Sequence, residues 1–177
     1  MDTNLVTIYL VILIVLLGGA AIAVVRQIFV TRRIEGRLSK LQKKVAKGDG
    51  TAKDFYELGS ILLDKKLYSQ AIAQLQKAIK SKDMKGDENK AIVHNALGFA
   101  YAAQEQYDIA MRQYKDALKL QPEYPTALNN LAFTYERKKL ESQALEAYEK
   151  VLKYEPKNAI AKKRSASLKR RLVSSQG

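Results

Sequence analysis

The spacing of small residues and prolines most constrains what this chain can fold into. A leucine followed by a small residue occurs three times, at Leu58-Gly59, Leu97-Gly98 and Leu131-Ala132, and the last two pairs lie 34 residues apart. Pro122 and Pro156 repeat the same step. Small residues allow helices to approach closely, and a proline ends a helix because it cannot continue the hydrogen-bond ladder. The spacing therefore predicts stacked pairs of antiparallel helices, A and B.

This period is typical of tetratricopeptide repeats (TPRs), which form curved, all-α solenoids that bind other proteins. We place three repeats at 52–85, 91–124 and 125–158, and a basic capping helix at 159–173. Each repeat has a small residue on helix A, and we expect an alanine of helix B to face it. These pairs are Gly59 with Ala71, Gly98 with Ala110, and Ala132 with Ala144.

Local signals mark two helix starts and one irregularity. Thr51 and Asp54 have the spacing of a capping box at the start of the first helix A, and Pro125 suits the first turn of the third. The polar residues 85–89 exceed the 34-residue period. We expect them to lengthen the loop after the first helix B without breaking the stack.

The segment 5–25, which follows a short tail at 1–4, contains no charged residue, and 14 of its residues are Leu, Ile or Val. As a helix it spans roughly 32 Å, enough to cross a hydrocarbon core of ~30 Å. A cleaved secretory signal is the alternative, but a signal would carry Lys or Arg at its start, and residues 1–4 contain neither. The segment therefore predicts a permanent transmembrane anchor.

Basic residues follow the anchor, because residues 26–47 carry eight of them and one acidic residue. The positive-inside rule then places the repeats on the cytoplasmic side, or the equivalent side of an organelle membrane, with the N-terminus across the membrane. Apolar residues recur at helical spacing, and they predict an amphipathic helix within 26–50 that lies on the membrane, self-associates or packs under the first repeat. They are Ile34, Leu38, Leu41 and Val45. Candidate contacts to headgroups or an acidic partner are Arg32, Arg33 and Arg37.

The net charge of +13 is concentrated outside the repeats. Residues 48–156 have equal numbers of basic and acidic residues, whereas 157–177 have seven basic residues and no acidic one. A neutral repeat body does not favour nucleic acid as the partner. The basic C-terminal helix is interpreted as a solvated cap, with docking of an acidic segment as the alternative. Its candidate contacts are Lys162, Lys163, Arg164, Arg170 and Arg171.

Residues with catalytic or metal-binding chemistry are scarce. The chain has one histidine, His94, and no cysteine, and His94 occupies a repeat position that usually holds a core aromatic residue. Neither a phosphate-binding glycine loop nor a metal-ligand spacing is present. We therefore expect a protein that is not an enzyme and that needs no cofactor, metal or small-molecule substrate.

The concave face built by the A helices is the predicted protein-binding groove. In a TPR stack, positions 2, 5, 9 and 12 of each repeat line this face. Asn side chains there can bind a peptide backbone, and exposed Phe side chains offer apolar contact area. The alternative is that the phenylalanines pack between repeats. The candidate groove residues are Tyr56, Ser60, Asn95, Phe99, Asn129, Phe133 and Glu136.

Two stretches are more specific than the repeat consensus: Val24-Val25-Arg26-Gln27-Ile28-Phe29 at the end of the span and Phe55-Tyr56-Glu57-Leu58-Gly59-Ser60 in the first repeat. With the overall layout, they make the chain resemble the small membrane-anchored TPR proteins of cyanobacteria and plastids that assist assembly of photosystem I. The resemblance implies a thylakoid location, with the repeats in the cytoplasm or stroma, and binding of photosystem I subunits or assembly intermediates. The alternative is a recruiting scaffold for another membrane system, such as cytochrome maturation or protein translocation.

Overall fold

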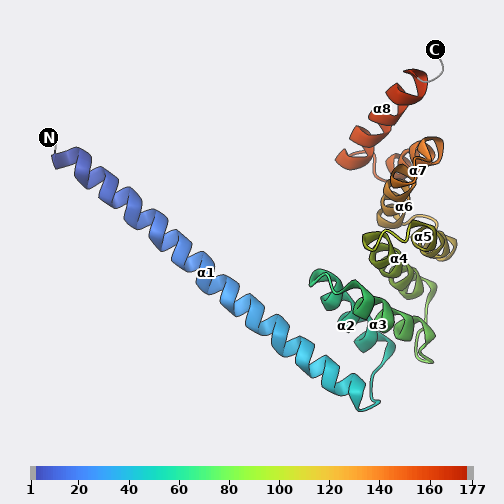
Figure 1. The fold of residues 1–177 in the computed structure, drawn as a ribbon, viewed down its shortest axis with the longest axis horizontal. Coiled ribbons are helices and arrows are strands. Elements are labelled where there is room, and N and C mark those ends of the chain that lie inside the picture. The colour runs from blue at the N-terminus through green and yellow to red at the C-terminus, as the bar shows by residue number, and fades with distance from the viewer. Residues whose placement is uncertain (1–2, 175–177) are drawn as a thin grey trace. The chain divides into compact units, whose positions relative to one another are not determined.

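The computed structural model describes residues 3–174, which form eight α-helices and no strand (Figure 1). Contacts divide the chain into two compact units after Lys43. The predicted all-α TPR solenoid with an N-terminal apolar helix is confirmed. The expected N-terminal tail at 1–4 lies partly outside the described residues.

The first helix, α1, runs without a break over Thr3–Ala46. It joins the apolar segment and the basic segment, which the sequence pattern treats separately, into one helix of 44 residues, or roughly 66 Å. Its large apolar side chains between Ile8 and Val30 are 44–72% exposed, so it is no core helix of a soluble domain. Among the described residues it is the helix long and apolar enough to cross a membrane. Further along it, Leu38 and Leu41 are buried.

The second unit is a succession of antiparallel helix pairs closed by a single last helix (Figure 1). The A helices begin each repeat, the B helices return, and α8 packs on α7 as the cap. The helices are α2 (Ala52–Asp64), α3 (Tyr68–Lys80), α4 (Asp87–Ala103), α5 (Tyr107–Leu120), α6 (Pro125–Arg137), α7 (Glu141–Tyr154) and α8 (Ala159–Ser174).

The predicted helix starts are present. The Thr51 hydroxyl accepts a hydrogen bond from the Asp54 N–H at 3.2 Å, and the Asp54 carboxylate accepts one from the Thr51 N–H at 2.9 Å, which completes the capping box of α2. Pro125 occupies the first turn of α6, where its missing N–H leaves no hydrogen bond unmade. Sequence signals therefore fix where two of the three A helices begin.

The extra residues between the first two repeats do more than lengthen a loop. The loop 81–86 is two residues longer than the loop 121–124, as expected, but α4 also has 17 residues, whereas α2 and α6 have 13. Helix α4 begins at Asp87, before the expected start at 91, because Asp87 and Glu88 place negative charge at the positive end of the helix dipole. Gly86 precedes it with φ +82°, a value that suits glycine.

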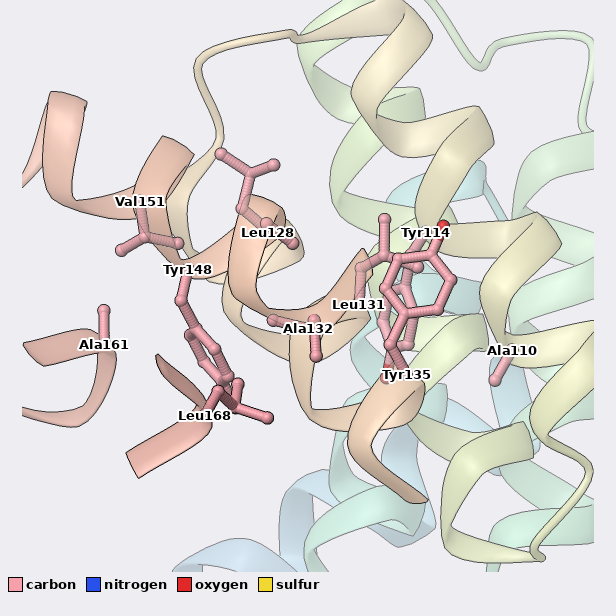
Figure 2. Packing of buried hydrophobic residues seen from close by; sticks show 12 residues of the cluster. Ala110, Tyr114, Leu128, Leu131, Ala132, Tyr135, Tyr148, Val151, Ala161 and Leu168 are labelled. Atoms are coloured by element: carbon pink, nitrogen blue, oxygen red, sulfur yellow. The ribbon is translucent and has the colours of Figure 1, made fainter. Parts of the chain in front are cut away.

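Small residues on the A helices make room for large side chains of the B helices. A Cβ at Gly98 would lie 2.6 Å from the Tyr114 ring, and one at Gly59 would lie 2.7 Å from Leu75. The expectation that alanines face the small residues is therefore incomplete, because the side chain one turn further along helix B fills the space. Tyr114 and Tyr148 are fully buried in the core of the later repeats (Figure 2).

Candidate protein-binding groove

The A helices form the inner face of the repeat stack. Besides packing on its own B helix, α4 contacts both α2 and α6, the A helices of the neighbouring repeats. Helices that lie closer together along a curved stack occupy its concave side. The candidate groove residues all belong to α2, α4 and α6.

Phe99 and Phe133 are the large apolar side chains that this face exposes to solvent. They occupy equivalent positions on α4 and α6, and their exposed fractions are 46% and 47%. Fully packed residues of these helices differ sharply, because Leu97 is 3% exposed and Ala132 is fully buried. Apolar side chains that remain this exposed in adjacent repeats favour contact with a partner.

The two groove asparagines have different surroundings despite their equivalent positions. The Asn95 carbonyl oxygen accepts a hydrogen bond from Asn130 Nδ2 at 3.0 Å, and Asn95 Nδ2 donates to the Tyr124 hydroxyl at 3.4 Å. The side-chain amide oxygen of Asn129, Oδ1, is buried and has no hydrogen-bond partner within the described chain. Asn95 is therefore held in place within the protein, whereas Asn129 keeps an unused acceptor.

Tyr56 and Ser60 lie at the N-terminal end of the face, on α2, and both are partly buried. Tyr56 is close to Tyr124, and burial, followed by this neighbour, raises the pKa of the Tyr124 hydroxyl. The Tyr124 hydroxyl is therefore a neutral hydrogen-bonding group at physiological pH.

Glu136 ends the candidate groove on α6 and is engaged by α7 and α8. Its carboxylate accepts a hydrogen bond from the Tyr148 hydroxyl at 2.8 Å, and it forms ion pairs with Arg164 at 3.5 Å and Arg171 at 3.7 Å. The side chain is only 12% exposed. Burial, followed by the Glu136 carboxylate, raises the pKa of Tyr148. The cap helix thus closes this end of the face.

The basic residues of α8 divide into paired and unpaired groups. Arg171 also pairs with Glu141 at 3.2 Å, and Arg164 lies over the ring of Phe133. Lys162, Lys163 and Arg170 are exposed and form no ion pair with a described residue. On α1, the other group of candidates, Arg32, Arg33 and Arg37, is exposed.

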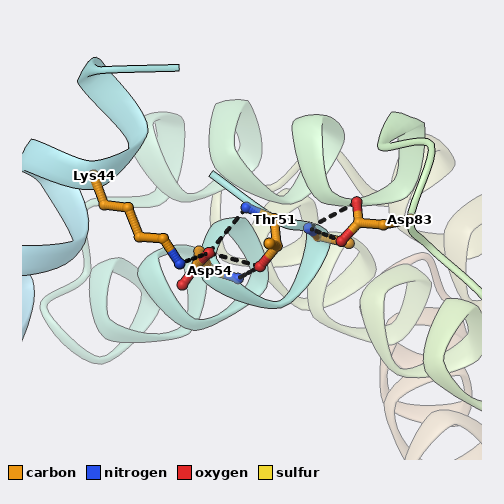
Figure 3. Close-up of polar contacts among 5 residues, drawn as sticks. Lys44, Thr51, Asp54 and Asp83 are labelled. Atoms are coloured by element: carbon orange, nitrogen blue, oxygen red, sulfur yellow. Dashed lines mark hydrogen bonds and ion pairs between the residues drawn. The ribbon is translucent and has the colours of Figure 1, made fainter. Parts of the chain in front are cut away.

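The sequence patterns did not reveal one residue that shapes this face. Asp83 stands where the first repeat would have its closing proline, and its carboxylate accepts hydrogen bonds from the Ala52 N–H at 3.0 and 3.2 Å (Figure 3). The departure from the proline pattern is the signal that could have identified it. His94, the single histidine, forms a hydrogen bond with Gln113 at 2.9 Å. The described residues contain no cluster of three His, Cys, Asp or Glu suited to a metal ion.

Comparison with protein families finds repeats of the predicted type in the second unit. A profile described as "Tetratricopeptide repeat" matches residues 55–83 and 125–158, and one described as "TPR repeat" matches residues 100–139. The repeat type is therefore shown, whereas the boundaries 52–85, 91–124 and 125–158 stay a prediction.

Two proteins are similar to nearly the whole chain, and one of them is named as chloroplastic. "Tetratricopeptide repeat domain-containing protein PYG7, chloroplastic" of Arabidopsis thaliana is 41% identical over 164 residues, which are 93% of this chain and 54% of PYG7. The chain therefore spans about half of that relative. "Uncharacterized protein ycf37" of Cyanophora paradoxa is 34% identical over 165 residues, which are 93% of this chain and 95% of ycf37.

Solved TPR structures share the fold. MamA superposes with a TM-score of 0.70 at 21% identity, covering 76% of each chain. The first TPR domain of Spaghetti (RPAP3), bound to the HSP90 peptide SRMEEVD, superposes with a TM-score of 0.64 at 20% identity, covering 70% of this chain and 94% of that one. At these identities the likeness supports the fold alone.

Proposed function

Because this chain belongs to the family of TPR proteins that includes chloroplast PYG7 and ycf37, we propose that it is a membrane-anchored scaffold that assists assembly or stabilisation of photosystem I. The fold is that of a protein-interaction scaffold. Its apolar helix and its chloroplast relative indicate association with a membrane. The proposal assigns that membrane to the thylakoid, with the repeats in the cytoplasm or stroma.

The observation that carries the proposal is the pair of half-exposed phenylalanines on adjacent A helices. Phe99 and Phe133 lie in a repeat body whose charges balance, so apolar contact is the interaction that this face can offer a partner. Protein interfaces use buried aromatic side chains as anchors, and a few of them supply most of the binding free energy. The groove residues from Tyr56 to Phe133 are therefore proposed to hold a protein segment.

The assignment to photosystem I is supported by the resemblance of residues 24–29 and 55–60 to the membrane-anchored assembly factors, and by the plastid relatives. The membrane helix would keep the groove within a short distance of membrane subunits. Anchoring raises the local concentration of the groove near such partners, so a modest affinity is sufficient.

Gentle solubilisation of the native membrane, affinity capture of the tagged chain and mass spectrometry test this function. We expect photosystem I subunits to be enriched with the wild-type chain, and to be depleted with the Phe99→Ser, Phe133→Ser double variant. Enrichment of haem-handling proteins would instead assign the chain to cytochrome maturation, and enrichment of translocon proteins would assign it to protein translocation. Either result would contradict the proposal.

A further inference from the structure

A hollow of about 480 Å³ opens at the N-terminal end of the repeat stack, between α2, α4 and the loop 81–86. Its lining is mainly apolar and includes Tyr56, Met84 and Ile92. Lys53, Lys85 and Asn89 also line it and supply polar groups. The hollow is large enough for a bulky side chain and lies beside the groove position of Tyr56.

The lengthened loop 81–86 and the first turn of α4 build one side of this hollow. Met84 and Lys85 belong to the lengthened loop, and Asn89 belongs to the additional first turn of α4. The loop 121–124 is two residues shorter, and α6 lacks the additional first turn that carries Asn89 in α4. The insertion therefore has a structural consequence that the TPR consensus does not require.

Hydrogen bonds within the protein hold the loop in this form. Asp83 caps the start of α2 through the Ala52 N–H (Figure 3), and the Met84 N–H donates to the Ser81 carbonyl at 3.1 Å. Asn89 Nδ2 donates to the Lys85 carbonyl at 2.9 Å, which joins the loop to α4. A pocket that is already shaped avoids the cost of ordering a loop when a ligand binds.

The charged groups at the hollow favour an acidic ligand. The Asp83 carboxylate is directed to the backbone N–H of α2, and neither Lys53 nor Lys85 forms an ion pair with a described residue. A carboxylate near the two ammonium groups would gain two ionic contacts, while an adjacent apolar side chain would contact Met84 and Ile92.

We propose that this hollow binds one bulky apolar side chain of a partner peptide in which an acidic residue lies next to that side chain. The inference deepens the proposed function, on which it rests in taking a protein segment as the occupant. It adds a specificity site to the groove: Phe99 and Phe133 offer general apolar contact, and the hollow selects the sequence of the bound segment.

A photo-cross-linking peptide tests the proposal with the full chain in nanodiscs. The probe has a benzoylphenylalanine between two aspartates, and the matched control probe has it between two lysines. We expect the acidic probe to cross-link within 83–93, with Met84 as the main site because benzophenone reacts readily with methionine. Cross-linking of both probes with equal yield, or only outside this segment, would overturn the proposal.

Variants separate this site from the rest of the groove. Lys53→Glu with Lys85→Glu changes two exposed side chains and should lower the yield with the acidic probe about tenfold, since each exposed ionic contact is modest. Circular dichroism checks that this variant remains folded. An undiminished yield in the folded variant would refute the site. Because the probe is synthetic, a positive result stands even if photosystem I subunits are not captured from membranes.

Discussion

The guanidinium of Arg164 lies over the ring of Phe133, with its central carbon 5.9 Å from the ring centroid. The same arginine pairs with Glu136, one turn further along α6. These contacts join the cap helix to the last repeat through the inner face itself. A partner that contacts Phe133 therefore also meets the Arg164 guanidinium beside the ring.

Glu136 should stabilise the packing of the cap helix α8 on the last repeat. Glu136→Gln removes the charge that Arg164 and Arg171 face and weakens the acceptor of the Tyr148 hydroxyl, so it should lower the free energy of unfolding by about 1–2 kcal/mol. Amide hydrogen exchange should increase along α8. The control Glu146→Gln affects an exposed i,i+4 pair with Lys150 and should change stability little. Equal behaviour of the two variants would contradict the role of Glu136.

Gly98 should tolerate no side chain. In Gly98→Ala the new Cβ would lie 2.6 Å from the ring of Tyr114, which is 1% exposed and has no free space to move into. Overpacking of this kind costs about 1–3 kcal/mol, and more than offsets the better helix propensity of alanine. Thermal unfolding followed by circular dichroism measures the loss. Gly36→Ala on α1, where the new Cβ would meet no side chain of another residue beyond its chain neighbours within 4 Å, is the control. An unchanged melting temperature for Gly98→Ala would show that the repeat register is wrong.

Acid should weaken the start of the first repeat through Asp54. The hydrogen bond from Lys44 at 2.6 Å, followed by those from Thr51, lowers the pKa of this carboxyl from 3.8 to about 2. Because the folded pKa lies below the unfolded one, the ionised form stabilises the fold at pH values above about 4, and this contribution disappears as the pH falls towards 2. Thermal unfolding of the wild type should show this loss between pH 4 and pH 2.

Asp54→Asn should be less stable than the wild type at neutral pH, and the difference should shrink in the same acid range. Asp116→Asn, which breaks an exposed pair with Lys119, serves as the matched control. If Asp54→Asn and the wild type differ equally at all pH values, the stabilisation comes from packing and not from the ionised carboxyl.

The sequence could predict the repeats because close packing of neighbouring helices requires small residues at fixed steps, and prolines mark where helices end. Gly98 is needed where the Tyr114 ring packs, and Gly59 is needed in the same way beside Leu75. The capping box of Thr51 and Asp54 was predictable for a similar reason, since all its members lie within one turn of chain.

The remaining features depend on residues that are distant along the chain. Asp83 and Ala52 are 31 residues apart, and no local pattern shows that one caps the other. The sequence placed Arg164 in the basic C-terminal helix and Phe133 in the groove, with no indication that they meet. Their contact forms only because α8 packs against the last repeat. The additional turn of α4 is the exception, because its cause is local: the acidic residues at its start favour helix over loop, and the 34-residue period does not carry this signal.

The charges around α1 predict the orientation of the chain in the membrane. With eight basic residues in 26–47, the repeats should lie on the cytoplasmic or stromal side. Protease added to sealed vesicles with that side outward should digest the chain beyond residue 50 and leave a protected fragment that contains the apolar part of α1. Vesicles of the opposite orientation are the control. If the repeats stay intact in vesicles with the cytoplasmic or stromal side outward, and are digested in vesicles of the opposite orientation, the assigned orientation is reversed.

Phe99 and Phe133 should contribute to partner binding more than to folding. Each side chain is nearly half exposed, so replacement by alanine removes less buried area than it would in the core. The loss of folding stability should therefore be smaller than the ~3–5 kcal/mol typical of a core phenylalanine. If they anchor a partner, each Phe→Ala change should cost about 2 kcal/mol or more in binding. Thermal unfolding and capture of photosystem I subunits, measured on the same double variant, separate the two roles. A variant that melts much earlier than the wild type would identify the pair as packing residues. One that remains folded and captures its partner at the wild-type level would move the binding site away from the groove, to the convex face, to α8 or to the membrane helix.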